Sequence, residues 1–123
     1  MAYIEGFVIA VPVARKQEFI EHGTRMDALF LELGALRVME CWEDDVPEGQ
    51  VTDFRKAVQA TADEAVVFSW IEWPDKQTRE SAMTEWETRA ESDERYQMDP
   101  GQMPFDGKRM IYGGFEPIVV LNA

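Results

Sequence analysis

The sequence has few of the residues on which covalent crosslinks and metal sites depend. Its 123 residues include one cysteine, Cys41, and one histidine, His22. One cysteine excludes an intrachain disulfide, and a chain without disulfides is typical of a reducing compartment. A domain of this length buries about two-thirds of the surface that its unfolded chain exposes, so it folds without crosslinks. We therefore expect one domain over residues 1–123.

Basic residues are also scarce. The chain has 12 Lys and Arg against 24 Asp and Glu, a formal net charge of −12 at pH 7. Binding to a phosphate backbone or to an anionic membrane depends on clustered basic side chains. The composition therefore argues against nucleic acid and membrane partners, and it chiefly favours solubility.

No stretch of the sequence is apolar for long enough to cross a bilayer. The opening segment, MAYIEGFVIAVPVARK, lacks the basic start of an export signal, and Glu5 interrupts its apolar run. The segment is typical of a strand instead. A cytoplasmic location is the default expectation.

Two periodic patterns of apolar residues predict the secondary structure. Spacings of three and four residues predict one helix over residues 14–33 and another over residues 76–92. β-branched and aromatic residues bounded by proline or glycine indicate strands. The expected strands span residues 3–11, 35–42, 64–73 and 109–121. In the last strand, Gly113 and Gly114 indicate a bulge or a close backbone approach, and Pro117 indicates a sheet edge.

This order of elements is that of the ferredoxin-like βαββαβ sandwich, an α+β fold. In that fold a four-stranded antiparallel sheet carries both helices on one face. The strand at residues 64–73 is apolar on both sides, so both faces of the sheet need cover. We expect a second copy of the chain to cover the helix-free face. The alternative is cover by the long polar connection at residues 43–63, which has room for a short strand or helix.

Four segments of the chain resemble the YbaA-like bacterial family, also described as domain of unknown function 1428. They are EGFVIAVP, ECWEDDVPEGQVTDF, VVFSWIEWP and, as the most specific, MPFDGKRMIYGGF at residues 103–115. The resemblance implies membership of the dimeric α/β-barrel superfamily, in which two ferredoxin-like domains pack sheet against sheet. That superfamily includes cofactor-independent oxygenases, haem-degrading enzymes, isomerases and effector-binding modules. The resemblance supplies no active-site residues.

Three polar residues are candidates for catalysis. His22 on the first helix is a possible general base, and Arg109 and Tyr112 at the last strand would orient or polarise a substrate. The alternative for His22 is a partly exposed helix residue that pairs with Glu18. The alternative for Arg109 is a turn with a local ion pair to Asp106.

A second group of residues is expected to bind a ligand. Phe68 and Trp70 share one side of their strand, and the strand aromatics that face away from the helices could line an apolar cavity between sheet and partner. Asp53, Phe54 and Arg55 in the long connection would then form its edge or lid. The alternative is that the aromatic side chains fill a dimer core that has no cavity.

Neither a metal nor a cofactor is expected. The acidic cluster around Asp44 and Asp45 matches no metal-binding motif, and Gly107, Gly113 and Gly114 do not form a phosphate loop. Two hypotheses of function follow. The first is a homodimer of unknown function that binds a small apolar or aromatic molecule between sheet and loop. The second is a cofactor-independent enzyme, of oxygenase or isomerase type, that acts on a small organic substrate.

Overall fold

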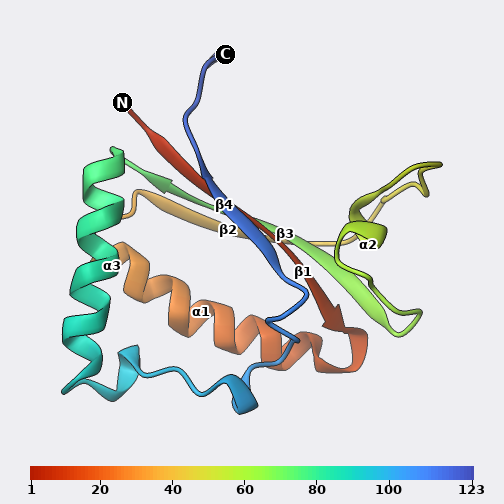
Figure 1. Ribbon diagram of the computed structural model, residues 1–123, viewed down its shortest axis with the longest axis horizontal. Coiled ribbons are helices and arrows are strands. Elements are labelled where there is room, and N and C mark those ends of the chain that lie inside the picture. Colours follow the sequence, from red (N-terminus) through yellow and green to blue (C-terminus); the bar gives the residue numbers. More distant parts are fainter.

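Four strands and two long helices form the protein (Figure 1). The computed structural model describes residues 1–123, except the side chain of residue 100. The strands are β1 (Tyr3–Pro12), β2 (Arg37–Trp42), β3 (Glu64–Trp73) and β4 (Ile111–Phe115). The helices are α1 (Lys16–Glu32), the short α2 (Phe54–Ala57) and α3 (Lys76–Ala90). Single 3-10 turns occupy Val13–Arg15, Glu94–Tyr96 and Pro100–Gln102.

The sheet has the order β2-β3-β1-β4, and every neighbouring pair is antiparallel. Both α1 and α3 lie on one face of this sheet (Figure 1). The predicted α+β, ferredoxin-like fold of the chain is therefore confirmed. The predicted helix or strand within the long connection is also present, as α2.

The main core lies between the two long helices and the sheet. β1 and β3 pair so that Ile9 stands opposite Val67, and the odd-numbered residues of both strands face the helices. Phe19 of α1 packs on Ile9 and Val67, and Ala82 of α3 packs on Trp73. Each aliphatic side chain buried in this way stabilises the fold by about 1.5–3 kcal/mol.

The last strand is shorter than predicted. It ends at Phe115 because Pro117 has no N–H to donate to a neighbouring strand. The expected bulge is absent among the described pairs of β4, where Gly113 and Gly114 keep a regular register with β1. The expected close approach is present, since the hydroxyl of Tyr3 lies where a Cβ on Gly114 would stand.

The connection between β2 and β3 folds onto one end of the helix-free face. The Asp53 carboxylate caps α2 by accepting a hydrogen bond from the Lys56 amide at 2.7 Å. Val58, just after α2, is buried against Ala10 and Val66 of the sheet. The connection covers only that end, so the loop that the sequence offers as an alternative cover accounts for part of the face. Farther along, Phe68 and Ile111 remain 43% and 46% exposed.

Arg109 ties this connection to the turn before β4. Its guanidinium donates to both carboxylate oxygens of Glu64, at 2.8 and 2.7 Å, and to the Gln59 carbonyl at 2.9 Å. It also pairs with Asp106 at 3.0 Å, as the sequence suggests. The hydrogen bonds from Arg109 lower the pKa of the buried Glu64 carboxyl to about 2.

We expect Arg109→Ala to lower the free energy of unfolding by about 2–3 kcal/mol at pH 7, because buried Glu64 would lose its partner. Since the pKa of Glu64 is depressed, this contribution is present above its ordinary pKa of 4.5 and is lost as the pH falls toward 2. Urea denaturation at several pH values measures it. Lys76→Ala, which removes only an exposed pair with Glu80, serves as the control. If the difference in unfolding free energy between the wild-type protein and Arg109→Ala did not shrink at low pH, the ion pair with Glu64 would not be its cause.

Candidate functional site

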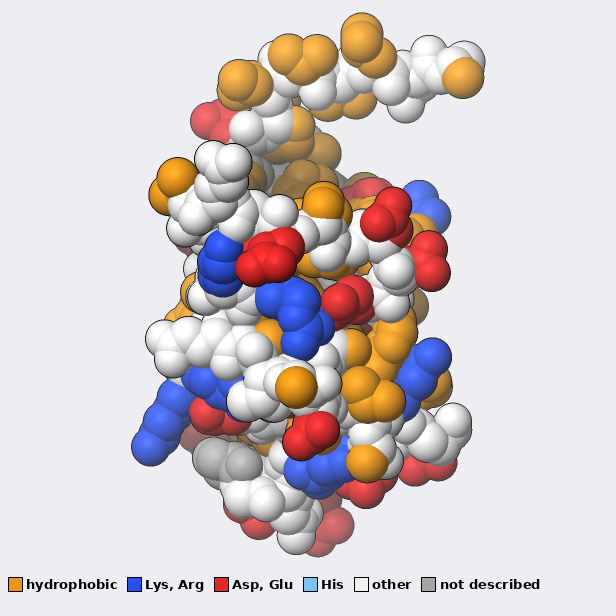
Figure 2. All heavy atoms as spheres, turned by 90° about the vertical axis from the view of Figure 1, so that its right-hand side faces the viewer, with side chains coloured by type: hydrophobic (Ala, Val, Ile, Leu, Met, Phe, Trp, Pro, Cys, Tyr) orange, Lys and Arg blue, Asp and Glu red, His pale blue; other side chains and the backbone are white. Residues whose placement is uncertain are grey.

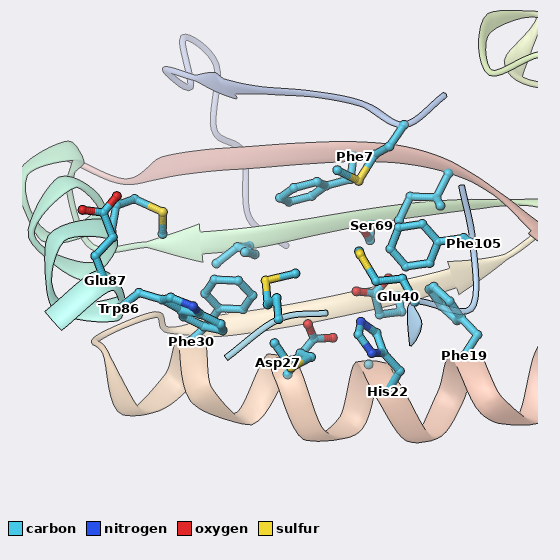
Figure 3. A pocket seen from close by; sticks show the side chains of 18 residues that line it. Phe7, Phe19, His22, Asp27, Phe30, Glu40, Ser69, Trp86, Glu87 and Phe105 are labelled. Atoms are coloured by element: carbon cyan, nitrogen blue, oxygen red, sulfur yellow. The ribbon is translucent and has the colours of Figure 1, made fainter. Parts of the chain in front are cut away.

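A cavity of about 360 Å³ lies between α1, α3 and the helix-covered face of the sheet (Figure 3). The segment that follows α3 closes its remaining side. This volume lies within the range of small-molecule sites. Aromatic side chains line the cavity: Phe7, Phe19, Phe30, Trp86 and Phe105. Five of the seven methionines also line it: Met26, Met83, Met98, Met103 and Met110. Flexible thioether side chains let such a wall adapt to different ligand shapes.

Few polar side chains reach this cavity. His22 and Asp27 project from α1, Glu40 from β2, Ser69 from β3 and Glu87 from α3. In Figure 3, His22 and Asp27 rise from the helix toward Glu40 on the sheet. Asp27 faces the sheet because it lies one helical turn from both buried Gly23 and half-buried Phe30, on the same side of α1.

The carboxyl groups of Asp27 and Glu40 lie near each other between α1 and β2, close enough for each to affect the pKa of the other. Ser69 of β3 stands opposite Glu40 in the sheet and lines the same cavity. Gly23 leaves space beside the pair, because a Cβ at this position would already touch Asp27 Oδ2 at 3.7 Å and Glu40 Cγ at 3.8 Å. Two acidic side chains therefore meet in a largely apolar cavity.

Burial raises the pKa values of both acids. The pKa of Asp27 rises to about 6, mainly through desolvation. The pKa of Glu40 rises to about 8, through desolvation first and then through the charge of Asp27. Glu40 is also exposed to solvent on the edge strand β2, which moderates the rise of its pKa. The two raised pKa values lie on either side of pH 7, the range in which one carboxyl of a pair can donate a proton while the other accepts one.

His22 stands at the rim of the cavity, with its ring centroid 6.0 Å from that of Phe105. Burial, followed by the charge of Arg25, lowers the pKa of the imidazole, so His22 is neutral at pH 7. The pairing with Glu18 that the sequence suggests is not seen, because Glu18 bonds instead to Arg15 at 2.9 Å.

Of the residues that the sequence suggests for catalysis or binding, His22 alone lines this cavity in the described part of the chain. Arg109 holds Glu64, and Arg55 donates to Glu43 at 2.7 Å, so both guanidinium groups secure the long connection. Tyr112 lies on the edge strand, where its ring stacks on Phe7 at 6.3 Å between centroids.

The other suggested residues lie on or beside the opposite face of the sheet. The rings of Phe54 and Phe68 meet at 5.9 Å, and those of Phe68 and Trp70 at 5.7 Å. Asp53 caps α2 next to them. These residues form an aromatic surface, which we call the open-face patch, and its ligand-binding role stays a prediction.

The sequence patterns single out neither residue for this cavity: Asp27 is not among the candidates, and Glu40 counts only as part of the acidic cluster around Asp44 and Asp45. A signal was present in both cases, because Asp27 adjoins the apolar stripe of the first helix and Glu40 shares a strand face with Val38 and Trp42. A charged residue among apolar neighbours on one face is a candidate for burial. Their mutual contact depends on how α1 crosses β2, which no local pattern reveals.

The described residues also meet the requirements of neither a metal site nor a membrane-spanning helix. No group of three or more His, Cys, Asp or Glu side chains is arranged there to hold a metal ion. None of the helices in the described chain combines the length and the hydropathy needed to span a membrane.

Comparison with known proteins settles the family. The family model described as "Protein of unknown function (DUF1428)" matches residues 2–107. The chain belongs to this family. The "Uncharacterized protein YbaA" of Escherichia coli strain K12 is 52% identical over 119 residues, which cover 97% of this chain and 98% of that protein. YbaA of Shigella flexneri matches to the same extent. The YbaA-like resemblance of the sequence is thus confirmed.

Two solved structures share the fold of this DUF1428 protein. A mutant of SnoaB, a cofactor-independent oxygenase from Streptomyces nogalater, aligns with a TM-score of 0.56 and 16% identity, over 99% of this chain and 98% of its own. A dimeric ferredoxin-like protein from an uncultured marine organism aligns with a TM-score of 0.53 and 11% identity over the whole of both chains. At such identities the similarity establishes the fold alone.

Proposed function

We propose that the protein binds a small apolar or aromatic molecule in the cavity between helices and sheet and transfers a proton on it through Asp27 and Glu40. The observation that carries this proposal is that two carboxyls with raised pKa values, Asp27 and Glu40, lie next to each other on the wall of an apolar cavity. Carboxyl groups with raised pKa values in a concave site are typical of acid–base catalysts. A positioned acid or base of this kind accelerates a reaction by about 10²–10⁴-fold.

The pair favours an enzyme over a passive binding protein. An apolar ligand gains nothing from two desolvated carboxyls, whose burial costs folding free energy. Their presence is explained if they act on the ligand, and proton transfer without a cofactor is chemistry of the isomerase type. The oxygenase type is a second candidate, supported by the fold that the chain shares with SnoaB.

Deuterium incorporation tests the proposal even while the substrate is unidentified. The protein is incubated in D₂O with a small-molecule extract of Escherichia coli, and the extract is returned to H₂O before high-resolution mass spectrometry. Only carbon-bound deuterium survives this step. We expect at least one compound to gain deuterium with the wild-type protein, and Asp27→Asn and Glu40→Gln to reduce its rate by about 100-fold or more.

The control is Glu91→Gln, which alters an exposed glutamate at the end of α3 and should leave the rate unchanged. Failure of every compound to gain deuterium would overturn acid–base chemistry at this site. It would also be overturned if the Asp27→Asn and Glu40→Gln variants incorporated deuterium as fast as the wild-type protein.

We also infer a cytoplasmic homodimer that pairs through the helix-free face of the sheet. The open-face patch supports this, as does the apolar segment after β4, in which Ile118 and Leu121 are 92% and 89% exposed. This segment projects from the sheet with its hydrophobic side chains uncovered (Figures 1 and 2). A second copy would cover both surfaces. The dimeric state of one protein with this fold is consistent with such pairing.

A further inference from the structure

We infer that the cavity selects an organic cation, a molecule in which a protonated amine is attached to an apolar or aromatic body. This inference rests on the proposed function, because it takes the same cavity as the binding site. It adds the charge of the ligand, which the fold and the family leave open.

The first support is that the carboxyl pair has no cationic partner among the described residues. Asp27 and Glu40 lie beside each other in the cavity, and Ser69 is the uncharged polar residue next to Glu40. No Lys or Arg of the described chain lines the cavity. Lys16 borders an adjoining hollow that Glu40 also reaches, but its ammonium lies 4.9 Å from the centre of the Trp42 ring. A ligand ammonium would supply the charge-assisted hydrogen bonds that the pair lacks.

The second support is the aromatic wall beside the pair. The rings of Phe30 and Trp86 lie 5.1 Å apart between centroids, and both line the cavity. Aromatic faces attract cations and also pack against apolar rings. Glu87 adds a further negative charge at the α3 end. An amine with an aromatic body would interact favourably with both the carboxyl groups and the aromatic rings of the cavity. An anion would find only acidic side chains and a neutral imidazole.

No element around the carboxyl pair in the described chain places a Lys or Arg side chain in the cavity. The titratable groups facing the cavity are His22 and Asp27 from α1, Glu40 from β2 and Glu87 from α3. The segment after α3 contributes only Met98, Met103, Phe105 and Met110. An ammonium bound here would favour the ionised form of both carboxyls and release a proton bound to the pair. Binding should therefore tighten as the pH rises through the range from about 6 to 8, where the pair titrates.

Three matched probes test the inference: 2-phenylethylamine, the uncharged 2-phenylethanol and the anionic 3-phenylpropionate. Binding to the full chain is followed by NMR titration of the backbone amides. At pH 8 we expect the amine to bind at least tenfold more tightly than the alcohol, and the anion to bind most weakly. At pH 5 the advantage of the amine should shrink, and calorimetry in two buffers should detect proton release at pH 7.

Variants assign the effect to the carboxyl pair. Glu40→Gln should lose the preference for the amine but still bind the alcohol, whereas Glu91→Gln should retain the preference. Equal affinity for amine and alcohol, or a preference that survives Glu40→Gln, would overturn the organic-cation inference and leave the proposed function standing. Absence of binding by all three probes in the millimolar range would overturn both.

Discussion

Glu40→Gln is expected to unfold at a higher temperature than the wild-type protein at pH 8 and at nearly the same temperature at pH 4. Below its ordinary pKa of 4.5, Glu40 is protonated in both the folded and the unfolded state. Above this pH the unfolded state releases the proton, while the folded state keeps it until about pH 8. The wild-type protein therefore loses stability across this window as the pH rises. Glutamine has no proton to release.

We expect the difference to reach about 2 kcal/mol at pH 8, or about 6–8 °C in melting temperature. This is less than half of what the full pKa shift corresponds to, because solvent in the cavity screens the charge. Calorimetry or circular dichroism at several pH values measures it. Glu91→Gln serves as the control, and its difference in melting temperature from the wild-type protein should not change with pH. If Glu40→Gln were less stable than the wild-type protein at pH 8, the carboxyl pair would not be protonated as described.

Ile111→Asp is expected to convert a homodimer into a monomer at micromolar concentration. Ile111 is 46% exposed on the helix-free face, opposite Val8 of β1. In a two-fold dimer each substitution would occur twice, and each would bury an unpaired charge in the interface. We expect the dissociation constant to rise by about 100-fold or more, as for a central interface residue.

Ile20→Asp is the matched control. Ile20 has the same residue type and the same 46% exposure, but it lies on α1, on the other side of the molecule. Sedimentation velocity compares the wild-type protein with both variants, and circular dichroism verifies that they fold. A wild-type protein that sediments as a monomer at micromolar concentration would contradict the homodimer, and so would an Ile111→Asp variant that remains dimeric.

The two sets of substitutions should act independently. The carboxyl pair lies on the helix-covered face of the sheet, and the open-face patch lies on the other. Glu40→Gln should thus leave the sedimentation of the protein unchanged, and Ile111→Asp should leave its pH-dependent stability difference intact. Effects at sites with no shared partners normally add.

The secondary structure and the fold class were accessible from the sequence because they depend on local patterns. A run of β-branched and aromatic residues, apolar on both sides and ended by Pro74, identified β3, and the stripe at Phe19, Met26 and Phe30 identified α1. The family followed from the segment at residues 103–115. The end of the last strand was predicted wrongly, because Pro117 competes with a run of β-branched residues and only the pairing partner decides the outcome.

The position of the cavity, in contrast, was not accessible from the sequence. Phe68 and Trp70 suggested a pocket on the helix-free face, whereas the cavity that holds Asp27 and Glu40 lies on the other face, where α1 crosses β2. Asp53 and Arg55 border a separate hollow beside α2. Arg55 was suggested for the edge or lid of a site and Arg109 for orienting a substrate. Each guanidinium has carboxylate partners within the fold, which the sequence does not reveal for Arg55.

By itself the sequence determined an acidic α+β chain of the ferredoxin-like class, since periodicity and composition are properties of single segments. Only the tertiary structure decided which of the 24 acidic residues meet on the wall of the cavity. Asp27 and Glu40 are 13 residues apart and belong to different elements. Their raised pKa values arise from desolvation and mutual charge, which depend on the distance and the burial that packing creates.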